Sequence, residues 1–163
     1  MSAILLNGPS SSGKSTLATA LQRAILLQKN GDYPIVSIDD FLQMSVGKPI
    51  YEEDVFEVGP QICARIREQC DARHGIIIDH VITSARIFRQ ILDALGTERP
   101  LLVRVSCPPP ELARRERARG DRAPGSAEAS ERYLFPQGGY DLTVDTFRDS
   151  PAVCAQKIIN KMG

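Results

Sequence analysis

The chain has 163 residues, and its 20 Lys and Arg residues balance its 20 Asp and Glu residues, so the formal net charge is zero. This length predicts a single domain, residues 1–163, with a substantial apolar core. The balanced charge argues against a nucleic-acid-binding protein, and no segment resembles a membrane-spanning helix or a signal peptide. We therefore expect neither a nucleic acid nor a membrane among its partners.

The cysteines point to a reducing compartment. Cys63, Cys70, Cys107 and Cys154 show neither a C-x-x-C pair nor the spacing of a zinc site. This usage favours reduced, mostly buried thiols in a cytoplasmic protein.

The first predicted strand, residues 3–7, leads directly into a glycine-rich loop and a helix predicted over residues 15–29. The loop reads Gly8-Pro9-Ser10-Ser11-Ser12-Gly13-Lys14-Ser15 and fits the complete P-loop pattern G-x-x-x-x-G-K-[ST]. Strand, loop and helix occur in the order that this pattern requires. We therefore expect residues 8–15, together with Thr16, to bind the phosphates of a nucleoside triphosphate.

Each fixed position of the loop has a physical role. Gly8 and Gly13 allow the backbone to turn its N–H groups toward a phosphate, where a Cβ atom would intrude. The N-terminus of the next helix adds unpaired N–H donors and partial positive charge. We expect Lys14 to neutralise the β- and γ-phosphates and the Ser15 hydroxyl to hold Mg²⁺. ATP and Mg²⁺ are the expected cofactors, and the sequence leaves GTP open as an alternative.

Four more apolar runs predict strands, and helices alternate with them. The strands are expected over residues 35–39, 75–79, 101–106 and 141–145, and the helices over residues 60–73, 85–95, 110–119 and 151–162. The strand runs are rich in Ile, Val and Leu, which is typical of strands buried on both faces of a parallel sheet. The sequence thus predicts a three-layer α/β fold with a five-stranded parallel sheet, whose ligands bind beyond the carboxyl ends of the strands.

Two adjacent carboxylates, Asp39 and Asp40, close the second predicted strand. One is expected to face the ligand crevice and the other to face solvent or cap a turn. We assign Asp39 the task of accepting a proton from an acceptor hydroxyl, or of orienting it, as its oxygen attacks the γ-phosphate. The alternative is that both are solvated turn residues.

The third predicted strand ends in Asp79 and His80 after three isoleucines. An apolar strand closed by an aspartate is the Walker B pattern, so we expect Asp79 to hold Mg²⁺ directly or through water. Two interpretations of His80 stay open. It contacts an acceptor or a phosphate, or it is a hydrogen-bonded histidine below the edge of the sheet.

An arginine-rich segment follows the fourth predicted strand. Residues 114–122 contain five arginines and two acidic residues, and the segment ends in Gly120-Asp121-Arg122, a candidate hinge. Arginine binds phosphate oxygens through a planar fork, so we expect residues 110–135 to form a helical lid that closes over the triphosphate. The alternative is a solvated, charged helix face. The turn after the fifth strand, near Asp145, is expected to lie close to a nucleotide base.

Over nearly its whole length the chain resembles the chloramphenicol phosphotransferase family of P-loop small-molecule kinases. The matching segments are residues 6–15, 38–39, 58–60, 76–79, 118–125 and 140–146. The resemblance implies a fold like that of shikimate and nucleotide kinases and ATP-dependent phosphorylation of a hydroxyl on a small molecule. It places Asp39 at the family's catalytic aspartate. It also matches Arg115, Arg119 and Arg122 to arginines of the family's lid, whereas Arg114 and Arg117 do not match.

The chain departs from the family pattern at two places. His80 stands where the family tends to have a second aspartate, and residues 41–57 look shorter and carry the acidic run Glu52-Glu53-Asp54. These residues are expected to shape the acceptor pocket. The resemblance therefore supports the reaction better than it supports chloramphenicol as the substrate. Kinases of the shikimate, gluconate or adenylylsulfate type, or a toxin that phosphorylates a sugar nucleotide, stay open.

A nucleotide-dependent switch or binding module is the alternative from another class. A GTPase switch needs N-K-x-D to read guanine, but the chain has Asn160-Lys161-Met162-Gly163 without the aspartate. Residues 93–96 fit D-x-x-G but lie at the end of a predicted helix. We therefore favour the kinase, and the sequence does not decide between a monomer and a homo-oligomer.

Overall fold

Five parallel strands form a sheet in the order β2-β3-β1-β4-β5 in the computed structural model of the chain, which describes residues 3–43, 47–72, 75–97 and 99–163. β1 (Ala3–Asn7) lies at the centre and pairs with β3 (Ile76–His80) and β4 (Leu101–Ser106). β2 (Ile35–Ser37) and β5 (Leu142–Asp145) pair outside them. This arrangement confirms the predicted five-stranded parallel sheet.

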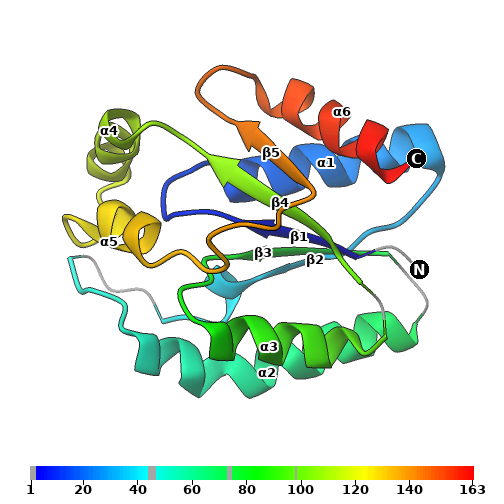
Figure 1. The fold of residues 1–163 in the computed structure, drawn as a ribbon, viewed down its shortest axis with the longest axis horizontal. Coiled ribbons are helices and arrows are strands. Elements are labelled where there is room, and N and C mark those ends of the chain that lie inside the picture. The colour runs from blue at the N-terminus through cyan, green and yellow to red at the C-terminus, as the bar shows by residue number, and fades with distance from the viewer. Residues whose placement is uncertain (1–2, 44–46, 73–74, 98) are drawn as a thin grey trace.

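Helices cover both faces of the sheet (Figure 1). α1 (Lys14–Lys29) and α6 (Pro151–Met162) lie on one face, and α2 (Glu52–Asp71) and α3 (Ala85–Leu95) lie on the other. α4 (Pro109–Arg119) and α5 (Ser126–Arg132) stand at one end of the sheet, beside the loop that follows β1. Because all the strands are parallel, their carboxyl ends meet at this end. No helix in the described ranges is long and apolar enough to cross a membrane.

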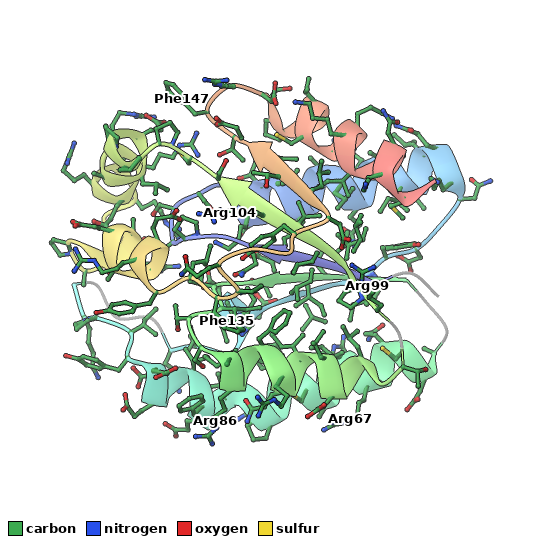
Figure 2. All side chains as sticks on the ribbon, in the orientation of Figure 1. Arg67, Arg86, Arg99, Arg104, Phe135 and Phe147 are labelled. Atoms are coloured by element: carbon green, nitrogen blue, oxygen red, sulfur yellow. The ribbon has the colours of Figure 1, made fainter. Side chains whose placement is uncertain are left out.

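The side chains of β1 divide between two apolar cores. Ile4 and Leu6 belong to the core beneath α1 and α6, whereas Leu5 belongs to the core beneath α2 and α3. This alternation follows from the two-residue period of a strand. Figure 2 shows side chains filling both layers, with Phe135 next to α3, where its ring packs edge-on against Phe88 at 5.7 Å between centroids.

Two of the predicted elements differ from the expectation by two or more residues at one or both ends. β2 ends at Ser37 rather than at Asp39, because residues Ile38–Asp40 form one turn of 3₁₀-helix (η1) with Ser37 as its N-cap. α2 begins at Glu52 rather than near Pro60, which lies inside the helix. The acidic run fills the first turn of α2, where negative charge is favoured, and the Tyr51 N–H donates to the Asp54 carboxylate at 2.7 Å.

A fully buried amide, Asn7, ends the central strand and joins three parts of the chain. Its Nδ2 donates to the Phe135 carbonyl at 2.8 Å and to the Tyr140 hydroxyl at 2.9 Å, and its Oδ1 accepts from the Ile82 N–H at 3.0 Å. The Phe135 N–H in turn donates to the Ile82 carbonyl at 2.8 Å. Asn7 therefore fixes the segment after α5 and the segment after β3 to the strand that precedes the glycine-rich loop.

We expect Asn7→Ala to lower the free energy of unfolding by about 3 kcal/mol, because it leaves buried donors and acceptors without partners. Urea unfolding measures this loss. Asn160→Ala is the matched control, since the Asn160 side chain accepts a bond from Gln156 on the exposed surface of α6. Its expected effect is within about 0.5 kcal/mol of zero. Equal stabilities of the two variants would contradict the role of Asn7.

Candidate active site

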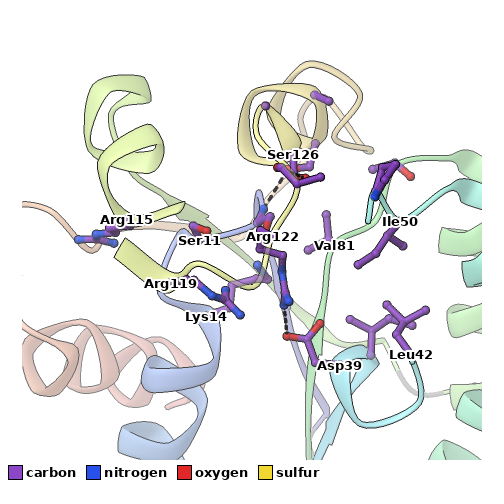
Figure 3. A pocket seen from close by; sticks show the side chains of 18 of the residues that line it. Ser11, Lys14, Asp39, Leu42, Ile50, Val81, Arg115, Arg119, Arg122 and Ser126 are labelled. Carbon is purple, nitrogen blue, oxygen red and sulfur yellow. Dashed lines mark hydrogen bonds and ion pairs between the residues drawn. The ribbon is translucent and has the colours of Figure 1, made fainter. Parts of the chain in front are cut away.

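A cavity of about 1100 Å³ opens at the carboxyl ends of the strands. The glycine-rich loop, η1, β3, α4 and α5 all contribute to its walls, and Figure 3 shows it from close by. The lining includes Lys14, Asp39, Asp79, Arg119 and Arg122. The structure thus brings together side chains that the sequence analysis selected from four separate segments.

The glycine-rich loop has the conformation of an anion-binding cradle. Ser11 and Gly13 both lie in the left-handed region, with φ of 65° and 89°. Alternation of right- and left-handed residues turns successive N–H groups toward one side, which forms a concave anion site at the start of α1. Gly8 is required for a different reason from the one expected, because a Cβ atom there would collide with the Val105 carbonyl of β4.

The Lys14 ammonium lies over this loop. Its Nζ donates to the Pro9 carbonyl at 2.8 Å and to the Ser12 hydroxyl at 3.4 Å. Burial lowers the pKa of Lys14 below its ordinary value of 10.5, an effect that the nearby carboxylates of Asp79 and Asp39 oppose. A phosphate in the cradle supplies the negative charge that such a buried ammonium favours.

Ser15 and Asp79 form a set of oxygen donors at the base of the cavity. The Ser15 hydroxyl donates to Asp79 Oδ2 at 2.7 Å, and the Ser37 hydroxyl donates to the same oxygen at 3.2 Å. A hydroxyl and one carboxylate next to a phosphate site match the preference of Mg²⁺, which binds few protein oxygens together with substrate phosphates and water. The residues present therefore fit the metal that the sequence analysis assigned to Ser15 and Asp79. Ser37, which holds the carboxylate, was not foreseen.

Asp39 and Arg122 form an ion pair across the cavity. Arg122 Nη2 lies 3.0 Å from Asp39 Oδ2, drawn as a dashed line in Figure 3, and Arg122 Nη1 lies 3.2 Å from Asp121 Oδ2. The Arg122 side chain is 6% exposed and that of Asp39 is 39% exposed, so the pair is screened from solvent mainly on the arginine side. Asp40 is exposed and does not line the cavity. The structure thus separates the two adjacent carboxylates as expected.

The other two arginines expected to act in catalysis lie differently. Arg119 reaches toward Lys14 and pairs with Asp121 at 3.1 Å, whereas Arg115 points away from that group (Figure 3). Arg115 donates to the Thr146 hydroxyl at 2.9 Å and to the Ser12 carbonyl at 3.4 Å. Arg115 therefore joins the glycine-rich loop to the end of β5. It lines the same cavity as Arg119 and Arg122, but its side chain points away from theirs.

A carboxylate inside the arginine-rich segment connects α4 to α5, which lies within the helical lid expected over residues 110–135 but was not predicted as a separate helix. Glu116 of α4 is buried, and it accepts from the N–H groups of Gly125 at 2.9 Å and Ala127 at 2.7 Å. These N–H groups belong to the first turn of α5, which has no earlier carbonyls to bind. Glu116 therefore caps α5 and holds the two helices together.

The wall opposite the glycine-rich loop is mainly apolar. It consists of Leu42, Pro49, Ile50, Tyr51, Val55, Val81 and Tyr133, with Glu52 of the acidic run beside them. Ile50, Tyr51 and Tyr133 are exposed large apolar side chains. In the described part of the lining, the cationic residues come from the glycine-rich loop, from α4 and from the turn after α4. The cavity is thus divided into a cationic half and an apolar half.

His80 is not in this cavity. Its side chain is buried on the α2 and α3 side of the sheet, next to Cys63 and Gln90, and its Nδ1 has no hydrogen-bond partner among the described residues. Of the two interpretations left open, the structure agrees with a hydrogen-bonded histidine below the sheet edge, since the ring has a hydrogen bond with the Val81 backbone that partly opposes the lowering of its pKa. Burial lowers the pKa of His80 to about 4, and the positive charge of Lys14 adds to this effect.

Two contacts of the glycine-rich loop escaped the sequence analysis. The Thr146 hydroxyl donates to the Ser12 carbonyl at 2.6 Å, and the Ser10 N–H donates to the Ser130 hydroxyl at 2.9 Å. The partners are 134 and 120 residues apart in the sequence. The motif at residues 140–146 was the available signal for Thr146, whereas nothing in the sequence pattern marked Ser130.

A comparison with protein families matches residues 1–163 to the family described as chloramphenicol phosphotransferase-like protein. The chain belongs to this family. The match confirms the resemblance seen in the sequence and the predicted enzyme class, a phosphotransferase of the P-loop kinase type. A search of curated proteins found no match.

Solved structures share the fold at low sequence identity. An APS kinase from Mycobacterium tuberculosis, solved with AMPPNP and APS, is 19% identical with a TM-score of 0.74, and the match covers 99% of this chain and 96% of that chain. A gluconokinase from Sinorhizobium meliloti is 19% identical with a TM-score of 0.72, over 98% and 90% of the two chains. Shikimate kinase from Aquifex aeolicus is 15% identical with a TM-score of 0.59, over 98% and 95%. These similarities establish the P-loop kinase fold.

We expect His80 to make the protein less stable in acid. The folded-state pKa of about 4 lies below the ordinary histidine value of 6.5, so the unfolded chain binds the proton more readily. The contribution of neutral His80 is complete above pH 6.5 and is lost as the pH falls toward about 4, by an amount of about 3 kcal/mol. Urea unfolding of wild type and His80→Phe at about pH 7 and about pH 4.5 tests this. Wild type should lose more stability than the variant, and an equal loss in both would contradict it.

Proposed function

We propose that the protein transfers the γ-phosphoryl group of ATP to a hydroxyl group of a small molecule with an apolar body, as in chloramphenicol 3-O-phosphorylation. The observation that carries this proposal is the position of Asp39 between the two halves of the cavity. On one side lie the cradle and its cations, and on the other lies the apolar wall. Family membership supports the reaction, and the wall supports the class of acceptor.

In this mechanism the loop amides and Lys14 hold the triphosphate, and Asp39 orients the acceptor hydroxyl or accepts its proton as its oxygen attacks. The reaction depends mainly on the alignment of the two oxygens with phosphorus and on stabilisation of charge, without a covalent enzyme intermediate. Arg119 and Arg122 would neutralise charge on the transferring group. Ser15 and Asp79 would hold Mg²⁺, which would supply positive charge next to the phosphates.

We also propose that α4 and α5, within residues 110–135, act as the lid. The arginines reach the cavity from α4 and from the turn that follows α4. Glu116 of α4 holds α4 and α5 together through its hydrogen bonds to the start of α5. The Arg122–Asp39 pair would then have to loosen for Arg122 to bind a phosphate oxygen and for Asp39 to bind the acceptor. This exchange replaces one charge-assisted contact with another, so its net cost is small.

An acceptor that is itself anionic, such as shikimate, gluconate or adenylylsulfate, is the alternative among kinases. Such a molecule needs a cation for its own charge in addition to those that bind ATP. The apolar wall carries Glu52 and no cation in the described part of the lining. The wall therefore favours a neutral acceptor with an aromatic or aliphatic body.

We expect Asp39→Asn to bind ATP with near wild-type affinity and to lower the turnover number by at least about a hundredfold, because the amide accepts no proton. Equilibrium binding and acceptor-dependent ADP release measure the two effects. Asp40→Asn is the matched control, because that carboxylate is exposed outside the cavity. Turnover by Asp39→Asn at the wild-type rate would eliminate Asp39 as the proton acceptor.

The acceptor class is testable with a panel of alcohols. With ATP and Mg²⁺, chloramphenicol and other neutral alcohols with aromatic bodies should stimulate ADP release more than shikimate, gluconate or adenylylsulfate. Lys14→Ala should abolish this stimulation, which would show that acceptor-dependent ADP release depends on the glycine-rich loop. A clear preference for one of the anionic acceptors would contradict the assignment of the apolar wall, and stimulation by no acceptor would contradict the kinase.

A further inference from the structure

α5 contacts the phosphate cradle directly. The Ser130 hydroxyl accepts from the Ser10 N–H at 2.9 Å and donates to the Ala127 carbonyl of its own helix at 3.0 Å. Ser10 and Ser130 both line the 1100 Å³ cavity. A side chain of α5 therefore occupies a loop N–H group at the place where the loop would bind a phosphate oxygen.

The position of α5 is well defined by other contacts. Glu116 caps its first turn, and Glu131 near its end forms an ion pair of 2.6 Å with Arg104 of β4. Both members of that pair are partly shielded, with 26% and 34% of their side chains exposed. The approach of Ser130 to the loop is therefore set by contacts of α5 with both α4 and β4 and does not rest on one surface contact.

Ser11, the next residue of the loop, combines two unfavourable features. It holds a left-handed φ of 65°, which costs a residue with a Cβ atom free energy that glycine would not lose. Its side chain is also buried, at 7% exposed, and Oγ has no hydrogen-bond partner in the described part of the chain. A buried hydroxyl without a partner is rare in folded proteins and indicates a partner from outside the chain.

The position of Ser11 in the cavity indicates which phosphate of the nucleotide would contact its hydroxyl. Ser11, Lys14, Arg119 and Arg122 surround the same part of the cavity, and Arg122 contacts Asp39 there (Figure 3). Transfer to an acceptor held by Asp39 requires the terminal phosphate to lie on this side. The phosphate nearer the base of the nucleotide lies farther along the loop, at the N-terminus of α1.

We propose that the hydroxyls of Ser11 and Ser130 bind the terminal phosphate of the nucleotide, so that α5 completes the γ-phosphate site. This inference rests on the proposed function in that the cradle binds ATP with its terminal phosphate on the side of Asp39. The Ser11 hydroxyl donates to one phosphate oxygen. Ser130 turns its O–H from the Ala127 carbonyl to the phosphate and releases the Ser10 N–H to it. The two serines thereby distinguish ATP from ADP.

Calorimetric binding of AMPPNP and of ADP, each with Mg²⁺, tests the proposal without any acceptor. Ser11→Ala and Ser130→Ala should each bind AMPPNP about tenfold more weakly, the value of one hydrogen bond to a charged group, and should bind ADP within about twofold of wild type. Ser126→Ala is the matched control in α5, because its hydroxyl donates to the Ala123 carbonyl at 2.6 Å. Its ratio of the two affinities should equal that of wild type.

Ser11→Gly separates binding from folding. Glycine relieves the left-handed backbone, so this variant should keep or raise the melting temperature while it loses affinity for AMPPNP. Unchanged AMPPNP affinity in Ser11→Ala and Ser130→Ala, or equal weakening for AMPPNP and ADP, overturns the proposal. Neither result affects acceptor phosphorylation by wild type, so the two proposals fail separately.

Discussion

The buried amide of Asn7 is the interaction on which the site depends. It is the last residue of the central strand, and the next residue begins the phosphate cradle. Its three hydrogen bonds hold the segments after β3 and after α5 against β1. The glycine-rich loop, the Asp79 carboxylate and the far end of α5 are thereby fixed relative to one another at the carboxyl edge of the sheet. Two further contacts position the glycine-rich loop. The Thr146 hydroxyl, directly after β5, donates to the Ser12 carbonyl, and Gly8 lies close to the Val105 carbonyl of β4.

The cavity gathers the positive charges of one lysine and several arginines next to two carboxylates. Lys14 is buried over its own loop with a lowered pKa, and the Arg119 and Arg122 charges stand nearby. The carboxylates of Asp39 and Asp121 hold these arginines in place. In the proposed function, a triphosphate would compensate these cations and would compete with Asp39 for Arg122. The same carboxylate is thus a partner of the lid arginine and the expected partner of the acceptor hydroxyl.

The parts of the site that depend on short sequence motifs were predicted from the sequence. The P-loop pattern and the run of isoleucines before Asp79 place a hydroxyl and a carboxylate 2.7 Å apart, because parallel strands end at a common edge. The Ser150 cap of α6 was equally visible, and its hydroxyl accepts from the Val153 N–H. The family resemblance supplied the reaction class, which composition and periodicity alone leave open.

The rest of the site depends on contacts between distant residues. α5 has seven residues and is capped by a carboxylate from another helix, so its own sequence carries little helical signal. Arg115 and Arg119 are one helical turn apart, yet Arg115 turns to Thr146, 31 residues later. The start of α2 was misplaced because proline is common at the first position of a helix, whereas Pro60 lies inside α2. Contacts between residues far apart in the chain determine these features, and a single sequence does not show which distant residues are in contact.

The apolar wall has a consequence for how this scaffold changes its substrate. Leu42, Pro49, Ile50, Tyr51 and Val55 all come from one stretch of chain between η1 and the first turn of α2. The residues of the proposed phosphate and metal sites come from other parts of the chain. Replacement of that one stretch would therefore alter which alcohol fits without disturbing the transfer chemistry. Sequence changes confined to this stretch, in evolution or by design, would then alter the acceptor preference while the residues of the proposed phosphate site stay the same.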